Sequence, residues 1–196
     1  MTALVAGAPS TDAECWKQIN WSEVRARVYR LQMRIAKAIR EERWGKAKAL
    51  QFILSRSFGA KLLAIKWVVS SKGSRTPGID GVKWRTPGQR WRAALALSSR
   101  GYRAQPLRRV LIPKKNGQLR PLGIPTLHDR AMQALYALGL KPIAETTADS
   151  HSYGFREKRS LHDAVKQCFI ALATKVAASW WADENQPKTL DFPYLK

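Results

Sequence analysis

The stretch RRVLIPKKNGQLRPLGIPTLHDR, residues 108–130, decides the fold, because it predicts a basic β-hairpin that leads directly into a helix. Two short strand-like segments flank Asn116-Gly117, and Asn-Gly is the strongest short signal for a two-residue type I′ turn. Prolines in both segments restrict the hairpin to edge-type pairing. Thr126 and Asp129 then provide the cap of the following helix.

Hydrophobic periodicity predicts helices on both sides of this hairpin. Apolar residues recur at three- and four-residue steps, which is the period of one helical face. The predicted helices are 22–43, the run from Leu50 to Val69, 87–99 after the capping residue Thr86, the segment after Thr126, and the segment after Ser160, which Ser160 and Asp163 cap. The predicted fold class is therefore α+β and mostly helical, with one basic β-hairpin.

The charge of the chain indicates a polyanionic partner. Lys and Arg number 35 against 14 Asp and Glu, a formal net charge of +21, which makes nucleic acid the expected ligand. We expect no membrane association, because no run of about 18 uncharged apolar residues occurs. The first residues lack the basic region of a signal peptide, so we expect a cytoplasmic protein.

The cysteines argue against two further classes of protein, those held by disulfides and those that bind a metal through cysteine. Cys15 and Cys168 are too few for a disulfide framework, and neither lies at metal-ligand spacing from His or Cys. We therefore expect no metal site and no cofactor bound by this chain alone.

The hairpin concentrates cationic residues that suit a triphosphate or a nucleic-acid backbone. Lys114, Lys115 and Arg120 lie near its tip, and Arg108 and Arg109 precede them. Lysine is a compact charge and arginine a bidentate fork, so together they can neutralise several phosphate oxygens. The alternative is that the charges only protect an exposed sheet edge from pairing with other chains.

The predicted turn places a condition on this site. With a two-residue turn, Lys114 faces Leu119 while Arg120 faces Pro113, so the two cations point to opposite faces of the hairpin. A bulge or strong twist near Pro113 or Pro121 must bring them together if both hold one triphosphate.

The helix over 22–43 offers a second basic surface. Arg30, Arg34 and Lys37 lie beside its apolar stripe with few interleaved acids. We interpret these residues as candidates for contacts to RNA phosphates, with an ordinary solvated helix face as the alternative.

The loop TPGIDG, residues 76–81, reads as a structural turn. Asp80 either accepts a hydrogen bond from its own backbone or binds an arginine of the hairpin. Trp67, Trp84 and Trp91 either stack on bases or, as their helix-related positions favour, fill the core.

Four segments together resemble a known family. TPGIDG (76–81), RRVLIPKKNGQLRPLGIPTLHDRAMQAL (108–135), KPIAE (141–145) and DSHSYGFREKRSLHDAV (149–165) are similar, in order and spacing, to the N-terminal and fingers region of bacterial group II intron reverse transcriptases, also called maturases. The resemblance covers about residues 21–179. It implies an RNA-directed DNA polymerase that also binds its intron RNA.

The resemblance also suggests roles for single residues. Lys114 and Arg120 are similar in position to the residues that contact the phosphates of the incoming nucleotide. Arg156 resembles a template-side or fingers-stabilising arginine, and the alternative is an ion pair with Asp149. The family often has Pro-Gly where this chain has Glu157-Lys158, so the local turn is expected to differ.

The catalytic carboxylates of such a polymerase are absent from the sequence. Two-metal nucleotide transfer needs an aspartate on one strand and an adjacent pair in a Tyr-x-Asp-Asp turn, and no two aspartates are adjacent here. Asp183 lies near the expected position of the first aspartate, but the strand pattern is broken after it. The resemblance ends near Trp180, so we expect a chain truncated before the catalytic palm and inactive alone, with Mg²⁺ needed only by the complete polymerase.

These observations give a domain division and a set of partners. The expected division is a flexible lead-in (1–20), a helical N-terminal extension (21–101), a fingers subdomain (102–179) and a divergent tail (180–196). The expected partner is intron or template RNA or an RNA/DNA hybrid, with a separate palm and thumb polypeptide as a further candidate. Two alternatives stay open: a stand-alone basic RNA-binding or chaperone module, and one half of a split reverse transcriptase.

Overall fold

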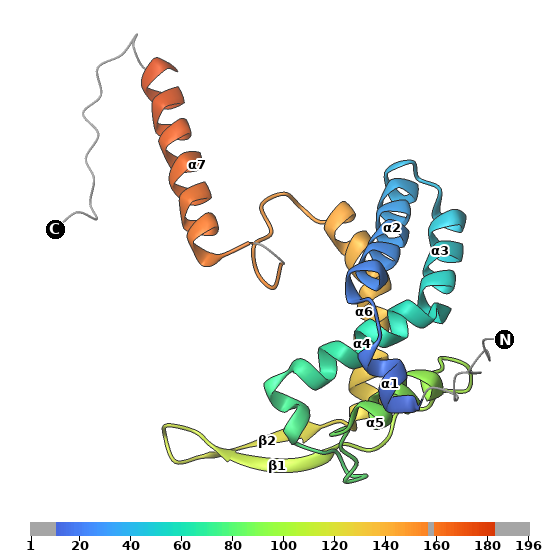
Figure 1. Cartoon of the computed structure of the whole chain (residues 1–196). Helices are drawn as coiled ribbons and strands as arrows, with labels where there is room; N and C mark the ends of the chain where they lie inside the picture. Colours follow the sequence, from blue (N-terminus) through green and yellow to red (C-terminus); the bar gives the residue numbers. More distant parts are fainter. Residues whose placement is uncertain (1–10, 157–158, 183–196) are drawn as a thin grey trace. The chain divides into compact units, whose positions relative to one another are not determined.

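Helices make up most of the chain in the computed structural model, which describes residues 11–156 and 159–182 (Figure 1). The chain divides into two units, which meet in sequence between Thr147 and Ala148. The first unit contains α1 (Asp12–Lys17), α2 (Trp21–Arg40), α3 (Trp44–Arg56), α4 (Phe58–Ser70), the short 3₁₀ helix η1 (Lys72–Arg75), α5 (Pro87–Ala96), β1 (Arg108–Pro113), β2 (Leu119–Ile124) and α6 (Leu127–Thr147). The second contains α7 (Leu161–Ala182). A mostly helical α+β fold with one antiparallel hairpin is thus confirmed for the described residues.

The core of the first unit lies where α2, α3, α4 and α6 pack together. The apolar stripe predicted on α2 is confirmed, since Val28, Ile35 and Ile39 are buried. Leu54 of α3 and Leu135 of α6 are fully buried as well. Each such side chain contributes about 1.5–3 kcal/mol through its removal from water, so this cluster holds the helices in place.

Helix α2 ends three residues earlier than its periodicity predicts. Glu42 adopts a left-handed conformation with φ 54°. The Arg43 N–H donates to the Ala38 carbonyl at 2.8 Å, and the Glu42 N–H donates to the Ile39 carbonyl at 2.9 Å. This is the Schellman arrangement that terminates helices, here with glutamate where glycine is usual.

The second periodic run forms two helices. Ser57 adopts an extended conformation with ψ 133°, which ends α3, and its hydroxyl accepts the Ala60 N–H at 3.2 Å, which caps α4. An apolar pattern can continue through such a break because both helices bury residues in the same core.

Helix α1 lies in a segment for which we expected only a flexible lead-in, so that expectation is wrong for residues 12–17. Thr11 and Glu14 form a reciprocal capping box. Trp16 is only 7% exposed and packs edge-on against Trp21 with ring centroids 5.1 Å apart. Residues 1–10 lie outside the described residues.

The other predicted caps are confirmed. The hydroxyls of Thr86, Thr126 and Ser160 accept the backbone N–H three residues later, at 3.3, 3.0 and 3.3 Å. Helix α5 ends at Ala96 and not at residue 99, because Leu97 turns extended and is fully buried.

The second unit consists of a loop and helix α7. Helix α7 carries exposed apolar side chains at three- and four-residue steps, including Leu161, Val165, Phe169 and Leu172. Within the described residues, no helix combines the length and the apolar character needed to cross a bilayer. Most of the tail expected over 180–196 falls outside the described residues.

Candidate nucleic-acid interface

The hairpin closes with a three-residue turn, so the expected two-residue turn is wrong. The Gly117 N–H donates to the Lys114 carbonyl at 3.0 Å, and the Lys114 N–H donates to the Gln118 carbonyl at 2.8 Å. Gly117 has φ 79°, and Asn116 Oδ1 accepts the Gln118 N–H at 3.2 Å. This pattern is a β-turn followed by a bulge at a left-handed glycine.

The register of the strands explains the longer turn. Ile112 pairs with Arg120, Val110 with Leu122, and Arg108 with Ile124. Leu111 and Leu119 lie exposed on one face, and this pairing gathers the partly buried side chains of Val110, Ile112 and Ile124 on the other. A slip of one residue in either strand would separate them, so the apolar pattern selects the register and with it the turn.

The same register brings three cations to one face. Side chains on a strand alternate between faces and paired residues share one. Lys114, Arg108 and Arg120 therefore share the face of Ile112. The bulge required for Lys114 and Arg120 is present, at Gly117 and not at Pro113 or Pro121.

The remaining hairpin cations lie elsewhere. Arg109 pairs with Gly123 and belongs to the opposite face, and Lys115 lies in the turn itself. In Figure 1 the hairpin occupies the end of the first unit that is distant from the connection between α2 and α3. All five hairpin cations are exposed.

The cations of α2 form a separate exposed surface. Arg30, Arg34 and Lys37 are exposed, and the 3- and 4-residue spacing places them along one side of the helix. Lys37 forms an ion pair with Glu41 at 3.8 Å, so its charge is partly neutralised. Helix α2 packs against α3, α4 and α6, and it lies apart from the hairpin in Figure 1.

The segment that leads into the hairpin is anchored to the start of α6. The Tyr102 hydroxyl donates to Asp129 Oδ1 at 2.6 Å, and the Thr126 hydroxyl donates to Asp129 Oδ2 at 2.7 Å. Burial, together with the hydrogen bond to Asp129, raises the pKa of Tyr102 to about 12. Burial also acts to raise the pKa of Asp129, but hydrogen bonds from Tyr102, Thr126 and the backbone of Gln105 outweigh it and lower that pKa.

The loop 76–81 fits tightly against the same helix start. A Cβ on Gly78 would lie 2.6 Å from Thr126 Cα and 2.7 Å from Thr126 N, so glycine is required by close approach. Asp80 Oδ1 accepts the Val82 N–H at 3.2 Å, as one of the two expected roles requires.

Arg130, which sequence reasoning missed, ties this loop to α6. Its guanidinium donates to the carbonyls of Gly73 at 2.7 Å and Thr76 at 2.8 Å. Nothing local marks this role, because its partners lie more than fifty residues earlier in the chain.

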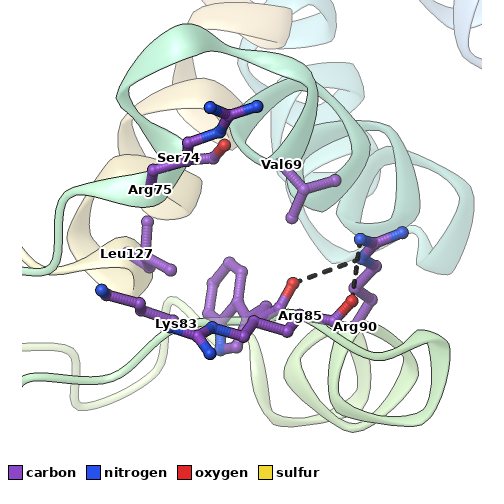
Figure 2. Close-up of a pocket in the computed structure, with 8 residues that line it drawn as sticks. Val69, Ser74, Arg75, Lys83, Arg85, Arg90 and Leu127 are labelled. Carbon is purple, nitrogen blue, oxygen red and sulfur yellow. Dashed lines mark hydrogen bonds between the residues drawn. The ribbon is translucent and has the colours of Figure 1, made fainter.

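A cavity of about 430 Å³ opens beside this loop and is lined largely by cations (Figure 2). Arg75, Lys83, Arg85 and Arg90 line it together with Ser74, Trp84, Val69 and Leu127. Arg90 is oriented by hydrogen bonds from Nε to the Trp84 carbonyl and from Nη2 to the Arg85 carbonyl. The sequence signal was present in the basic residues on either side of TPGIDG, but we had interpreted that loop as structural.

The three tryptophans differ in environment. Trp91 packs edge-on against Phe58 at 5.1 Å between ring centroids, as a core residue does. Trp84 packs on the core and also lines the cavity. Trp67 is 48% exposed, and Lys141 Nζ lies over its ring at 4.2 Å.

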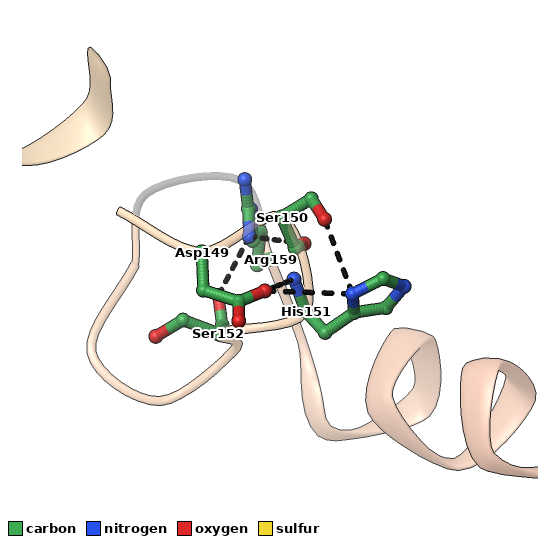
Figure 3. Close-up of polar contacts among 5 residues, drawn as sticks. All are labelled: Asp149, Ser150, His151, Ser152 and Arg159. Carbon is green, nitrogen blue, oxygen red and sulfur yellow. Dashed lines mark hydrogen bonds and ion pairs between the residues drawn. The ribbon is translucent and has the colours of Figure 1, made fainter. Parts of the chain in front are cut away.

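The loop of the second unit is held by Arg159 (Figure 3). Arg159 Nη1 donates to the carbonyls of Ser150 and Ser152 at 2.8 and 2.6 Å. Asp149, the acid considered as a partner for Arg156, contacts His151, whose backbone N–H donates to its carboxylate at 2.7 Å and lowers its pKa. Arg156 lies at the end of this loop, and its assignment to RNA stays a prediction.

No group of three or more His, Cys, Asp and Glu side chains that could hold a metal ion occurs among the described residues. The candidate site consists of the exposed cations described above.

Comparison with known proteins shows that the chain is similar to reverse transcriptases. Residues 16–97 match the model of the N-terminal domain of reverse transcriptase. The chain is similar to protein YkfC of Escherichia coli (strain K12), with 44% identity over 114 residues, which is 56% of this chain and 30% of that protein. It is also similar to the group II intron-encoded protein LtrA of Lactococcus lactis subsp. cremoris, with 36% identity over 107 residues, 53% of this chain and 18% of that protein.

A third relative, a 91 kDa protein in the cob intron of Schizosaccharomyces pombe, is 33% identical over 88 residues, 45% of this chain and 10% of that protein. The chain thus spans less than a third of the length of these relatives.

Proposed function

Because the chain is an N-terminal region of a group II intron reverse transcriptase, we propose that it binds template or intron RNA through the basic face of its fingers hairpin. In the complete polymerase, Lys114 and Arg120 hold the phosphates of the incoming nucleotide. Arg108 and Lys115 contact the nucleic-acid backbone beside them, whereas Arg109, on the opposite face of the hairpin, contributes long-range attraction alone.

The register of the hairpin is the observation that carries this proposal. It places Lys114 two residue pairs nearer the turn than the pair formed by Ile112 and Arg120, and therefore on the same face. Diagonal neighbours of this kind lie about 7–8 Å apart. A lysine and an arginine at this separation can bind different oxygens of one polyphosphate.

The overall charge supports binding at several points. With a net charge of +21, the affinity for RNA should depend strongly on salt, because each phosphate contact releases condensed counterions. The exposed residues Arg30, Arg34 and Lys37 of α2 extend the contact beyond the hairpin, and Arg156 adds a contact from the second unit.

A matched pair of variants tests the hairpin. Arg120→Ala and Arg109→Ala each remove one exposed arginine from the same hairpin, but from opposite faces. We expect Arg120→Ala to weaken binding of an RNA/DNA hybrid about tenfold, because a charge-assisted hydrogen bond contributes about 1.5–3 kcal/mol. Arg109→Ala should weaken it about twofold, through long-range attraction alone.

Fluorescence anisotropy at a fixed salt concentration measures both affinities. Equal losses for the two variants would contradict the assignment of the face, and salt-independent binding would contradict the proposal as a whole. The double variant Lys114→Ala/Arg120→Ala should lose less than the sum of the single variants, since both residues neutralise the same phosphates.

We propose that the chain alone does not polymerise nucleotides, because its sequence contains no adjacent aspartates to hold Mg²⁺. Primer extension by the purified chain with Mg²⁺ and nucleotides, at a rate above background, would overturn this part.

The exposed apolar residues of α7, among them Leu161 and Phe169, favour a second candidate: one half of a split polymerase, completed by a separate palm and thumb polypeptide. Such a pair should show polymerase activity when both polypeptides are mixed. Leu161→Asp or Phe169→Asp in α7 should abolish that activity and leave RNA binding by the chain unchanged.

A further inference from the structure

We propose that the cationic cavity beside loop 76–81 is a second binding site, which accepts a single nucleoside phosphate independently of the hairpin. The cavity lies between the end of α4, η1, residues 83–85 and α5. No hairpin residue is among the residues that line it.

The positive charge of the cavity favours an anionic ligand. Arg75, Lys83, Arg85 and Arg90 contribute four positive charges, and no acidic side chain lines the cavity. Arg75, Lys83 and Arg85 form no ion pair within the described part of the chain. Like charges gathered in this way repel one another, so a bound phosphate would relieve a repulsion that the protein does not neutralise itself.

The acid of loop 76–81, Asp80, has other partners. Asp80 lines a neighbouring cavity that shares Lys83 and Trp84 with this one. Its carboxylate accepts the Val82 N–H and interacts electrostatically with Arg130.

The walls of the cavity are held in place before any ligand binds. On one side, Arg130 binds the carbonyls of Gly73 and Thr76, on either side of Arg75 in the chain. On the other side, Gln89 Oε1 accepts the backbone N–H of Arg85 at 2.8 Å and of Thr86 at 3.1 Å. Figure 2 shows Ser74 and Arg75 on one side of the opening and Lys83 and Arg85 on the other, with Arg90 at the edge. Such preorganisation reduces the entropic cost of binding.

The size and the remaining lining select a nucleotide over a bare phosphate. A volume of about 430 Å³ lies within the range of small-ligand sites, roughly 300–1,000 Å³. Val69, Trp84 and Leu127 supply apolar surface, and the partly buried Trp84 can contact a base. The Ser74 hydroxyl adds a hydrogen-bonding group beside the cations.

Isothermal titration calorimetry with adenosine 5′-monophosphate tests the site directly. We expect saturable binding, at least about tenfold weaker binding of adenosine, which lacks the phosphate, and weaker binding of inorganic phosphate, which lacks the base. No saturable binding of the nucleotide, with no binding of the strand described next, would overturn the proposal.

The ligand of the cavity is either a free nucleotide or the phosphorylated terminal nucleotide of a strand. A short single-stranded RNA with a 5′-phosphate separates the two, in comparison with the same strand ending in a hydroxyl. Preference for the phosphorylated strand over the monophosphate indicates a strand end, and equal or tighter binding of the monophosphate indicates a free nucleotide.

Matched variants assign the binding to this cavity. Lys83→Ala/Arg85→Ala removes two lining charges, whereas Arg100→Ala/Arg103→Ala removes two exposed charges that do not line it. We expect the first to weaken binding of the nucleotide or phosphorylated strand at least about tenfold, and the control to change it less than about twofold. Circular dichroism confirms that each variant is folded, and equal losses in both double variants would overturn the assignment.

The hairpin variant separates this inference from the proposed function. Arg120→Ala should leave binding of the monophosphate unchanged. RNA/DNA hybrid binding that depends on Arg120, without any nucleotide site at Lys83 and Arg85, would refute only the cavity; the reverse result would refute only the hairpin.

Discussion

Substitution of Gly78 by alanine tests the packing of loop 76–81 against α6. The added Cβ would lie 2.6 Å from Thr126 Cα, 2.7 Å from Thr126 N and 3.0 Å from the Pro125 carbonyl carbon. All three are backbone atoms, well inside the ordinary contact distance of 3.4 Å, so no side chain can rotate away. The loop must therefore move from the start of α6.

This movement has a cost that can be assembled from its parts. Overpacking of a tight site costs about 1–3 kcal/mol. The displaced loop also strains the hydrogen bonds from Arg130 to Gly73 and Thr76, and the loss of one charge-assisted bond costs about 1.5 kcal/mol or more. We expect Gly78→Ala to lower the free energy of unfolding by about 3 kcal/mol.

Urea unfolding followed by circular dichroism measures this loss, with Gly81→Ala as the control. Gly81 lies in the same loop with φ 67°, but a Cβ there would meet nothing within 4 Å. Its substitution should cost only the conformational strain, about 1 kcal/mol. A loss for Gly78→Ala no larger than that for Gly81→Ala would refute the close approach to Thr126.

Two further substitutions test single contacts. Glu42→Gly should stabilise the chain by about 1 kcal/mol, because Glu42 has φ 54° at the end of α2; thermal unfolding should show no such gain for Glu42→Ala, and equal stability of both variants would argue against the strain. Tyr102→Phe should destabilise by about 1–2 kcal/mol at neutral pH, because it removes the 2.6 Å hydrogen bond to Asp129. The lowered pKa of Asp129 adds stability above its unfolded value of about 3.9, and this stability is lost as the pH falls through the folded value; Tyr102→Phe should therefore show a weaker loss of stability on acidification, and an unchanged acid dependence would contradict the role of this bond.

The sequence predicted those structural features correctly whose signal is local and strong. The apolar stripe of α2 and the capping residues Thr86, Thr126 and Ser160 were all predicted from spacing alone, because helix periodicity and caps depend on neighbours within four residues. The exposed cations were found in the same way, since their density in the chain is itself the signal.

The predictions from sequence failed where contacts between residues far apart in the chain determine the structure. Asn116-Gly117 favours a two-residue turn, but pairing of the apolar strand residues overrides that preference and selects three. Helix α1 is only six residues long and depends on burial of Trp16, which its own sequence cannot reveal. The basic cavity is assembled from segments between Val69 and Leu127, so no single motif predicts it.

The hydrogen bonds of Arg130 also set an order of events during synthesis. The carbonyl of Gly73 must wait for a partner that is 57 residues later in the chain, and closing so long a segment is entropically costly until other contacts have already drawn its ends together. A nascent chain released only as far as the hairpin lacks the side chain that holds the segment after α4. The cationic cavity is therefore completed only once α6 has emerged and docked.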